Sequence, residues 1–289
     1  MRPGQFSRPR SGSLGRVLIT GSSGALGSAI AASAAAHGWS VQGVDRVPGE
    51  WTTVVGDLRE PHVRRTAVAG MDAVVHVAAL HAPHVTQLPE AEFRTINVSV
   101  TDALLIESAK RATCRFVYTS STSVYGHSLV PTDRTVWVTE DLHPRPRDIY
   151  DETKLAAESP VKGSAISAVV LRVARCFPEP LPLLARYRLH RGVGLSDVAA
   201  AHVNALARTD VTGVFNVAGP LLFDEGDATE LYRSAPAVIR RRAPAEAHAF
   251  NELGWAPPDQ LDRVYDSRAA SRALGYAPRE GVLHLLSTI

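Results

Sequence analysis

The sequence has few cysteines, almost no net charge and no long apolar run. Its 289 residues include two cysteines, Cys114 and Cys176, and its net charge is +2. Because both cysteines lie in apolar stretches, we expect buried free thiols in a reducing compartment rather than a disulfide or a metal site. A charge this close to zero does not indicate nucleic acid or an acidic membrane surface as a partner.

The sequence also lacks a recognisable targeting or membrane-spanning segment. Residues 1–15 carry arginines among glycine, serine and proline without an apolar core, so we expect a disordered tail and not a secretory signal. No apolar run approaches the roughly 18 residues that a membrane-spanning helix needs. The expected location is therefore the cytoplasm, without a membrane partner.

Apolar runs typical of buried strands alternate with stretches typical of helices. Strands are expected at 17–20, 40–44, 52–55, 73–78, 115–119 and 168–173, and the longest helix at 90–110. This alternation predicts an α/β protein with a doubly wound parallel sheet. We expect residues 16–175 to form a nucleotide-binding domain. Residues 176–289 form a mixed region, in which a small substrate cap is combined with the final elements of the sheet.

Three glycines follow the first predicted strand and open the first predicted helix. Gly21 permits the tight turn, Gly24 lets backbone N–H groups approach a pyrophosphate, and Gly27 allows the helix to pack close to the sheet. The N-terminus of the helix attracts the anion as well. In this strand–turn–helix context the glycine spacing predicts a dinucleotide site of the Rossmann type.

Acidic residues end the next two predicted strands. Asp45 lies 24 residues after Gly21, where a carboxylate accepts hydrogen bonds from the adenosine ribose hydroxyls. The same carboxylate repels a 2′-phosphate, so NAD is favoured over NADP, although the adjacent Arg46 offers such a phosphate a cation. Asp57, followed by Leu58, either reaches the adenine amine or caps the following helix.

A tyrosine and a lysine one helical turn apart, Tyr150 and Lys154, carry the second chemical signal. The reference pKa of tyrosine, about 10, is too high for a base at neutral pH. A lysine on the same helix face favours the phenolate and can also hold the nicotinamide ribose. Tyr150 then exchanges a proton with a substrate hydroxyl as hydride leaves or arrives. Ser121 and Thr122, at the end of the fifth predicted strand, are placed to orient the substrate oxygen.

Together these motifs resemble those of the extended short-chain dehydrogenases/reductases, in the NAD-dependent epimerase/dehydratase group. The matching segments are 20–27, 56–58, 76–79, 121–126, 150–154, 266–269 and 274–278, with Asp45, Asn97 and Arg172. The resemblance covers most of residues 16–280 and implies that Ser121, Tyr150 and Lys154 are catalytic. It implies NAD contacts from Gly21, Gly24, Leu26, Asp45, Asp57, Leu58, Ala78, Asn97 and Lys154. We expect cofactor contacts also from Ser23, Ala25, Arg46, Ala79 and Tyr150.

Two departures from that family narrow the expected reaction. Thr122 and Ser123 stand where similar dehydratases carry an acid pair, and similar decarboxylases usually keep a Glu there, so elimination is disfavoured. The segment between Val173 and Asp197 holds roughly 23 residues, and Arg175 replaces the Asn usual in similar epimerases. So short a segment leaves little room to grip a nucleotide sugar, and a smaller substrate is expected.

Residues 172–180 are similar to the corresponding segment of uronate dehydrogenases, which oxidise a free sugar acid. In those enzymes an arginine shortly after the Pro-Glu-Pro binds the carboxylate of the substrate. In this chain, either Arg186 or Arg188 takes that role, or both are arginines on the surface of a helix. Just after the 78–79 loop, His81 faces the expected nicotinamide end and either touches the substrate or is a solvated loop histidine. The expected substrate contacts are His81, Thr122, Ser123, Arg175 and Arg186.

We therefore expect an NAD-dependent oxidoreductase that acts on a small sugar, sugar acid or polyol and uses no metal. A sugar-nucleotide epimerase and a non-catalytic NAD-binding sensor are the alternatives. Proteins similar to this chain pair through the helices that correspond to 90–110 and 150–160, so the resemblance implies a homodimer.

Overall fold

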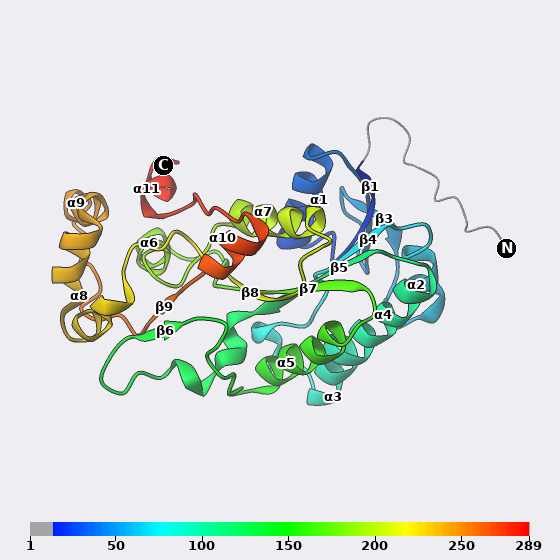
Figure 1. Cartoon of the computed structure of the whole chain (residues 1–289), viewed down its shortest axis with the longest axis horizontal. Coiled ribbons are helices and arrows are strands. Elements are labelled where there is room, and N and C mark those ends of the chain that lie inside the picture. The colour runs from blue at the N-terminus through cyan, green and yellow to red at the C-terminus, as the bar shows by residue number, and fades with distance from the viewer. Residues whose placement is uncertain (1–13, 289) are drawn as a thin grey trace.

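A seven-stranded parallel sheet forms the centre of the computed structural model, which describes residues 14–288 (Figure 1). The strands are β1 (Gly15–Thr20), β2 (Trp39–Asp45), β3 (Thr52–Val55), β4 (Ala73–His76), β5 (Arg115–Ser121), β7 (Ser167–Val173) and β8 (Gly213–Val217). Their order is β3-β2-β1-β4-β5-β7-β8, so the direction of winding reverses between β1 and β4. A crevice opens at the carboxyl ends of the strands at such a reversal. The predicted doubly wound parallel sheet is confirmed.

Helices cover both faces of the sheet, because successive side chains of a strand point to opposite faces. On one face α1 (Ala25–Ala36), α7 (Leu195–Ala207) and α10 (Arg268–Leu274) pack over Val17 and Ile19. On the other face α2 (Pro61–Ala67), α4 (Val100–Lys110) and α5 (Ile149–Lys162) pack over Leu18 and Phe116. Figure 1 shows α4 and α5 side by side on their face.

The segment expected as one long helix at 90–110 is helical throughout but irregular. It consists of α3 (Glu90–Phe93), a π-helical segment (Arg94–Ser99) and α4. Single π-helical turns are rare and occur frequently at functional sites. This one carries Asn97, whose buried side chain hydrogen-bonds the loop after β4. The irregular turn therefore belongs to the machinery that shapes the crevice.

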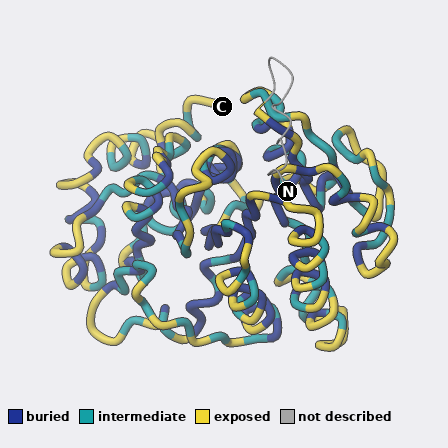
Figure 2. The backbone as a smooth tube through the Cα atoms, turned by 45° about the vertical axis from the view of Figure 1, so that its right-hand side comes forward, coloured by how far each residue is buried: buried dark blue, intermediate teal, exposed yellow. Residues whose placement is uncertain are grey.

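The second half of the chain divides between the sheet and a smaller cap. α7, β8 and α10 complete the sheet layers, whereas α6 (Leu181–Arg188), α8 (Ala228–Arg242), α9 (Pro244–Glu252) and α11 (Val282–Leu286) build the cap. Two short strands, β6 (Val136–Val138) and β9 (Arg263–Tyr265), pair in parallel beside them. Leu189, Phe223, Leu231 and Phe250 lie in the core of the cap. Figure 2 accordingly shows buried segments in both halves of the molecule.

Some local expectations are wrong. β1 begins at Gly15, inside the segment expected as a tail; the remainder of that tail, residues 1–13, lies outside the described residues. Cys114 is exposed rather than buried, because it lies in the turn that leads into β5, and Cys176 is only half-buried.

Within residues 14–288 no helix combines the length and the apolar composition needed to cross a membrane.

Candidate active site

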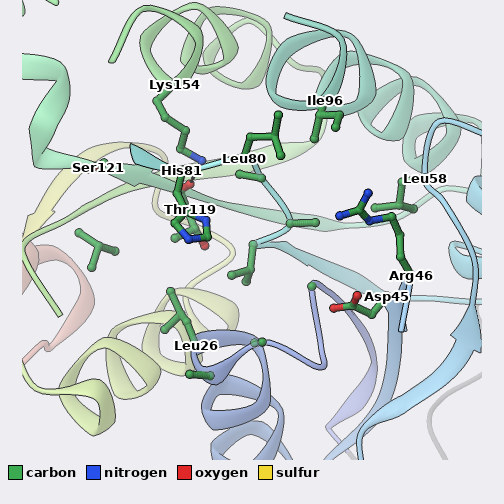
Figure 3. A pocket seen from close by; sticks show the side chains of 18 of the residues that line it. Leu26, Asp45, Arg46, Leu58, Leu80, His81, Ile96, Thr119, Ser121 and Lys154 are labelled. Carbon is green, nitrogen blue, oxygen red and sulfur yellow. Dashed lines mark hydrogen bonds between the residues drawn. The ribbon is translucent and has the colours of Figure 1, made fainter. Parts of the chain in front are cut away.

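A cavity of about 520 Å³ lies at the carboxyl ends of the central strands (Figure 3). In the close-up, Asp45 and Arg46 lie at one end of the cavity and Ser121 and Lys154 at the other. The lining residues include Gly21, Gly24 to Gly27, Asp45, Arg46, residues 56–59, residues 77–81, Ile96, Thr119, Ser121, Tyr150, Lys154, Cys176, Phe177, Pro178 and Leu195. The residues around Asp45 and those around Lys154 are distant in the sequence, yet they line the two ends of one elongated cavity. This shape suits a dinucleotide.

The glycine loop is shaped by contacts that leave no room for larger residues. Gly21 has a φ of +69°, in the left-handed region, and its carbonyl oxygen would lie 2.0 Å from a Cβ on Gly27. Gly24 is the N-cap of α1, and no side chain caps that helix end. The N–H groups of the first turn of α1 therefore remain available to an anion at the cavity. These features fit a bound pyrophosphate.

Asp45 is held at the mouth of this loop by two backbone donors. Its Oδ2 accepts a hydrogen bond from the Ser23 amide at 3.1 Å, and its Oδ1 accepts one from the Val47 amide at 3.2 Å. A carboxylate keeps further lone pairs that can accept from ribose hydroxyls. The Ser23 side chain does not line the cavity; its hydroxyl lies 2.7 Å from the Val47 carbonyl oxygen and fastens the β2–β3 connection.

Asp57 lines the same end of the cavity. Its carboxylate accepts hydrogen bonds from the Arg59 side chain at 3.0 and 2.8 Å, and this guanidinium lowers the pKa of Asp57. Glu60, not Asp57, is the N-cap residue of α2, so the alternative role of Asp57 as a helix cap is wrong. Arg46 is exposed beside them and adds a further positive charge.

Buried polar side chains hold the loop after β4 in place through hydrogen bonds to its backbone. Thr20 Oγ1 accepts hydrogen bonds from the amides of Val77 and Ala78, both at 3.0 Å. Asn97 accepts from the Leu80 amide at 2.8 Å and donates to the Leu80 carbonyl oxygen at 3.0 Å. Asn97 thus holds this loop and does not itself line the cavity, whereas Ala78, Ala79 and Leu80 do.

The predicted catalytic residues meet at the opposite end. Ser121 ends β5, and Tyr150 and Lys154 lie on the first turns of α5, whose N-terminus is capped by Asp148. All three line the cavity. Lys154 is buried, and its Nζ donates to the Thr119 carbonyl oxygen at 2.6 Å. The end of a strand and the start of a helix therefore place a hydroxyl, a phenol and an ammonium at one place.

Burial dominates the electrostatics of this end. It lowers the pKa of Lys154 to about 7, against the charge of Glu158. It raises the pKa of Tyr150 to about 12, with a hydrogen bond to Ser121 acting in the opposite direction. Burial therefore outweighs the lowering of the tyrosine pKa that was expected from Lys154, whose Nζ donates to the Thr119 carbonyl oxygen. Tyr150 is protonated at neutral pH and suited to donate a proton.

A buried ion pair supports the helix that carries these residues. Glu158, one turn after Lys154, accepts from Arg172 Nε at 2.9 Å and from Arg172 Nη2 at 2.7 Å. It also accepts a hydrogen bond from the Ser120 hydroxyl at 2.7 Å. Helix α5 and strands β5 and β7 are thereby tied together behind the cavity.

Four of the five predicted substrate contacts do not line the cavity. Thr122 is buried beneath it, and Ser123 lies in the short turn that follows β5. Arg175 forms an ion pair with Glu179. Arg186 donates to the Ala256 carbonyl oxygen at 3.2 and 2.8 Å, because its helix, α6, is itself part of the cap. Of the five, only His81 lines the cavity.

Several lining residues were not predicted. Leu80, Cys176, Phe177 and Leu195 contribute apolar or weakly polar surface to the cavity, and Thr119 supplies the carbonyl oxygen that holds Lys154. Strand-end position was the available signal for Thr119 and Leu80, since Thr119 ends the strand predicted at 115–119 and Leu80 lies two residues after the strand predicted at 73–78. Among the described residues, no group of three His, Cys, Asp or Glu side chains is arranged to hold a metal ion.

A model of the NAD-dependent epimerase/dehydratase family matches residues 17–178, the segment that contains the glycine loop and Tyr150. The chain belongs to this family. Its members are NAD-dependent enzymes of the extended short-chain dehydrogenase/reductase type, and the cofactor is NAD. The uncapped end of α1 and the Asp45 carboxylate are features of the cavity that fit this cofactor.

Similar curated proteins differ in activity. The chain is 37% identical to a 3-beta-hydroxysteroid dehydrogenase of Mycolicibacterium neoaurum over 162 residues, 52% of this chain and 43% of that protein. It thus spans less than half the length of this relative. A UDP-glucose 4-epimerase of Corynebacterium glutamicum is 26% identical over 90% of this chain and 97% of its own.

Solved structures share the fold over nearly the whole chain. A short-chain dehydrogenase/reductase superfamily protein of Agrobacterium tumefaciens with bound NAD has a TM-score of 0.71 at 20% identity, covering 94% of this chain and 95% of its own. MoeE5 in complex with UDP-glucose and NAD has a TM-score of 0.69 at 26% identity, covering 95% and 97%.

Proposed function

We propose that this family member is an oxidoreductase that transfers hydride between NAD and a carbon bearing a hydroxyl or carbonyl group. The observation that carries the proposal is the meeting of Ser121, Tyr150 and Lys154 at the end of the cavity opposite Asp45. When bound, NAD supplies the site that accepts or donates the hydride. The protein supplies binding, orientation and the proton.

Each residue has a defined part in this reaction. The N-terminus of α1 holds the pyrophosphate, Asp45 accepts from the adenosine ribose, and Lys154 holds the nicotinamide ribose. Ser121 orients the substrate oxygen. In the reducing direction hydride arrives at the carbonyl carbon, and the Tyr150 hydroxyl gives its proton to the oxygen. A tyrosine whose pKa is raised to about 12 stays protonated and ready for this step throughout the neutral range.

Substrates of the small sugar, sugar acid and polyol classes are the candidates that follow from the short segment after β7. Sugar-nucleotide epimerisation is the second candidate function, and similarity to a UDP-glucose 4-epimerase over 90% of the chain favours it. The sensor alternative has less support, because Tyr150 and Lys154 are both present and both line the cavity.

Turnover of NAD or NADH with panels of sugars, sugar acids, polyols, simple alcohols and ketones tests the proposal. We expect Tyr150→Phe to lower kcat by about 10²–10⁴-fold while the affinity for NAD stays within a few-fold, because the phenyl ring keeps the packing and removes the proton. Activity that survives Tyr150→Phe would refute the assigned role. Interconversion of UDP-sugars without net NADH formation would support the epimerase instead.

We also propose a homodimer that forms through α4 and α5, the helices that lie side by side on one face. Ile106 on α4 is a large exposed apolar side chain there. Sedimentation equilibrium of the purified chain and of Ile106→Glu tests this: the variant should be monomeric at concentrations that keep the original chain dimeric.

A further inference from the structure

The two ends of the cavity differ sharply in charge. The Asp45 end carries two carboxylates and two guanidinium groups, from Asp45, Arg46, Asp57 and Arg59. The lining residues tied to the Tyr150 end are Leu80, which packs against Tyr150, Cys176, which lies near Tyr150, and Phe177, which stacks on His81. Among residues 14–288, Lys154 is the one Lys or Arg side chain that lines this end; it is buried, it donates to the Thr119 carbonyl oxygen, and the proposed function assigns it to the nicotinamide ribose.

The arginines of the neighbouring segment are engaged elsewhere. Arg175 pairs with Glu179, Arg186 bonds the Ala256 carbonyl oxygen, and Arg188 bonds the Glu280 carbonyl oxygen at 3.0 Å. Arg191 pairs with Asp262 at 3.1 Å. None of these four lines the cavity. A carboxylate or phosphate carried to the Tyr150 end would lose its hydration without gaining a cation, which is strongly unfavourable.

Hydrogen-bonding groups at this end are also few. The Ser121 hydroxyl accepts from the Ser123 amide, and the Thr119 hydroxyl pairs with His202 Nε2 at 2.8 Å. His81 takes part in a capping box with His84. Ser121 and Tyr150 can serve the one oxygen that reacts, but a substrate with hydroxyls on every carbon would leave several of them without partners.

An exposed aromatic side chain lies at this end of the cavity. Phe177, in the connection from β7 to α6, is 43% exposed although it lines the cavity. Its ring stacks on His81, from the loop after β4, with centroids 6.1 Å apart and planes 25° apart. Figure 3 shows His81 close to Ser121 and Lys154, so the pair lies next to the reacting end. An apolar molecule bound here would bury the free face of Phe177.

We propose that this site takes an uncharged substrate whose reacting secondary alcohol or ketone is carried on an apolar carbon framework, and that Phe177 is the residue that selects it. The inference rests on the proposed oxidoreductase function and names its substrate class. It disfavours the acidic and fully hydroxylated members of the sugar class, because neither their charges nor their extra hydroxyls find partners at this end.

Three six-membered-ring ketones with the same reacting group form a matched test. They are 4-tert-butylcyclohexanone, 4-oxocyclohexanecarboxylate and a pentahydroxycyclohexanone. Binding to the NADH-loaded protein is measured by calorimetry, and reduction by loss of NADH absorbance. We expect the apolar ketone to bind at least about tenfold more tightly than either of the others, and to have the highest kcat/KM. Tighter binding or faster reduction of the charged or hydroxylated ketone would overturn the inference.

Variants at Phe177, with a control at a side chain of similar exposed fraction, test whether Phe177 selects the substrate. Phe177→Ala should raise KM for the apolar ketone by about tenfold and change kcat much less, since the ring is lost from binding and not from the chemistry; Phe177→Leu should keep most of the affinity. Leu253→Ala removes a side chain that is 44% exposed in the cap and should change neither constant. An unchanged KM in Phe177→Ala would overturn the assignment of Phe177.

The binding and turnover measurements separate the two proposals. If the apolar ketone binds best but none of the three is reduced, the proposed hydride transfer fails and the substrate class stands. If turnover occurs with the opposite preference, the substrate class fails and the hydride transfer stands.

Discussion

The buried ion pair between Glu158 and Arg172 makes a quantitative prediction about stability. Glu158 is fully buried, the Arg172 side chain is 5% exposed, and two short hydrogen bonds join them. Removing one member of such a pair leaves the other charge buried without a partner, which costs about 3–5 kcal/mol. We expect Glu158→Gln and Arg172→Met each to lower the free energy of unfolding by about this amount.

The double variant Glu158→Gln, Arg172→Met separates this explanation from simple loss of packing. It removes both charges, so no unpaired charge remains. We expect its loss of unfolding free energy to be smaller than the sum of the two single losses by at least about 2 kcal/mol. Urea denaturation followed by the fluorescence of the four tryptophans measures all four proteins. Single losses below about 1 kcal/mol, or fully additive losses, would refute the reasoning.

Two further predictions follow from burial and from the glycine loop. The pKa of Lys154 is about 7 in the folded protein and 10.5 in the reference state, so between these values the unfolded chain holds a proton that the folded chain has released. The free energy of unfolding should therefore rise from pH 7 to about 10.5, and this contribution is lost as the pH falls through 7. In Lys154→Met the dependence of the unfolding free energy on pH should be flatter over this range. A pH dependence unchanged in Lys154→Met would contradict the lowered pKa of Lys154. Gly27→Ala places a Cβ 2.0 Å from the Gly21 carbonyl oxygen, so we expect a stability loss of about 1–3 kcal/mol and a large loss of NAD affinity by calorimetry. Gly226→Ala, with no atom within 4 Å of its added Cβ, is the control and should change neither quantity.

The parts of the fold that sequence alone could predict are those set by local patterns. The apolar runs of the sheet strands, the three glycines after β1 and the one-turn spacing of Tyr150 and Lys154 each depend on residues close together in the chain. Parallel strands bring their carboxyl ends to one edge of the sheet, and Asp45 and Ser121, which end two of the strands, line one cavity together with Tyr150.

The parts that could not be predicted depend on distant partners. Whether Arg186 faces a substrate or the cap is decided by the Ala256 carbonyl oxygen, which no spacing rule connects to it. The pKa of Tyr150 depends on burial, which outweighs the effect expected from a nearby lysine. A signal for the Glu158–Arg172 pair was present, because Arg172 interrupts a strand of apolar residues and a buried charge requires a partner.

The pairing of β6 with β9 has a consequence for how the molecule is made. Val136 to Val138 leave the ribosome long before their partners at Arg263 to Tyr265, and β8 at 213–217 must still be added to the edge of β7. The glycine loop and Tyr150 are synthesised early, yet β7 keeps an open edge until residue 217 has emerged. Until β8 has been added, the edge of β7 is therefore free to pair with a strand of another chain.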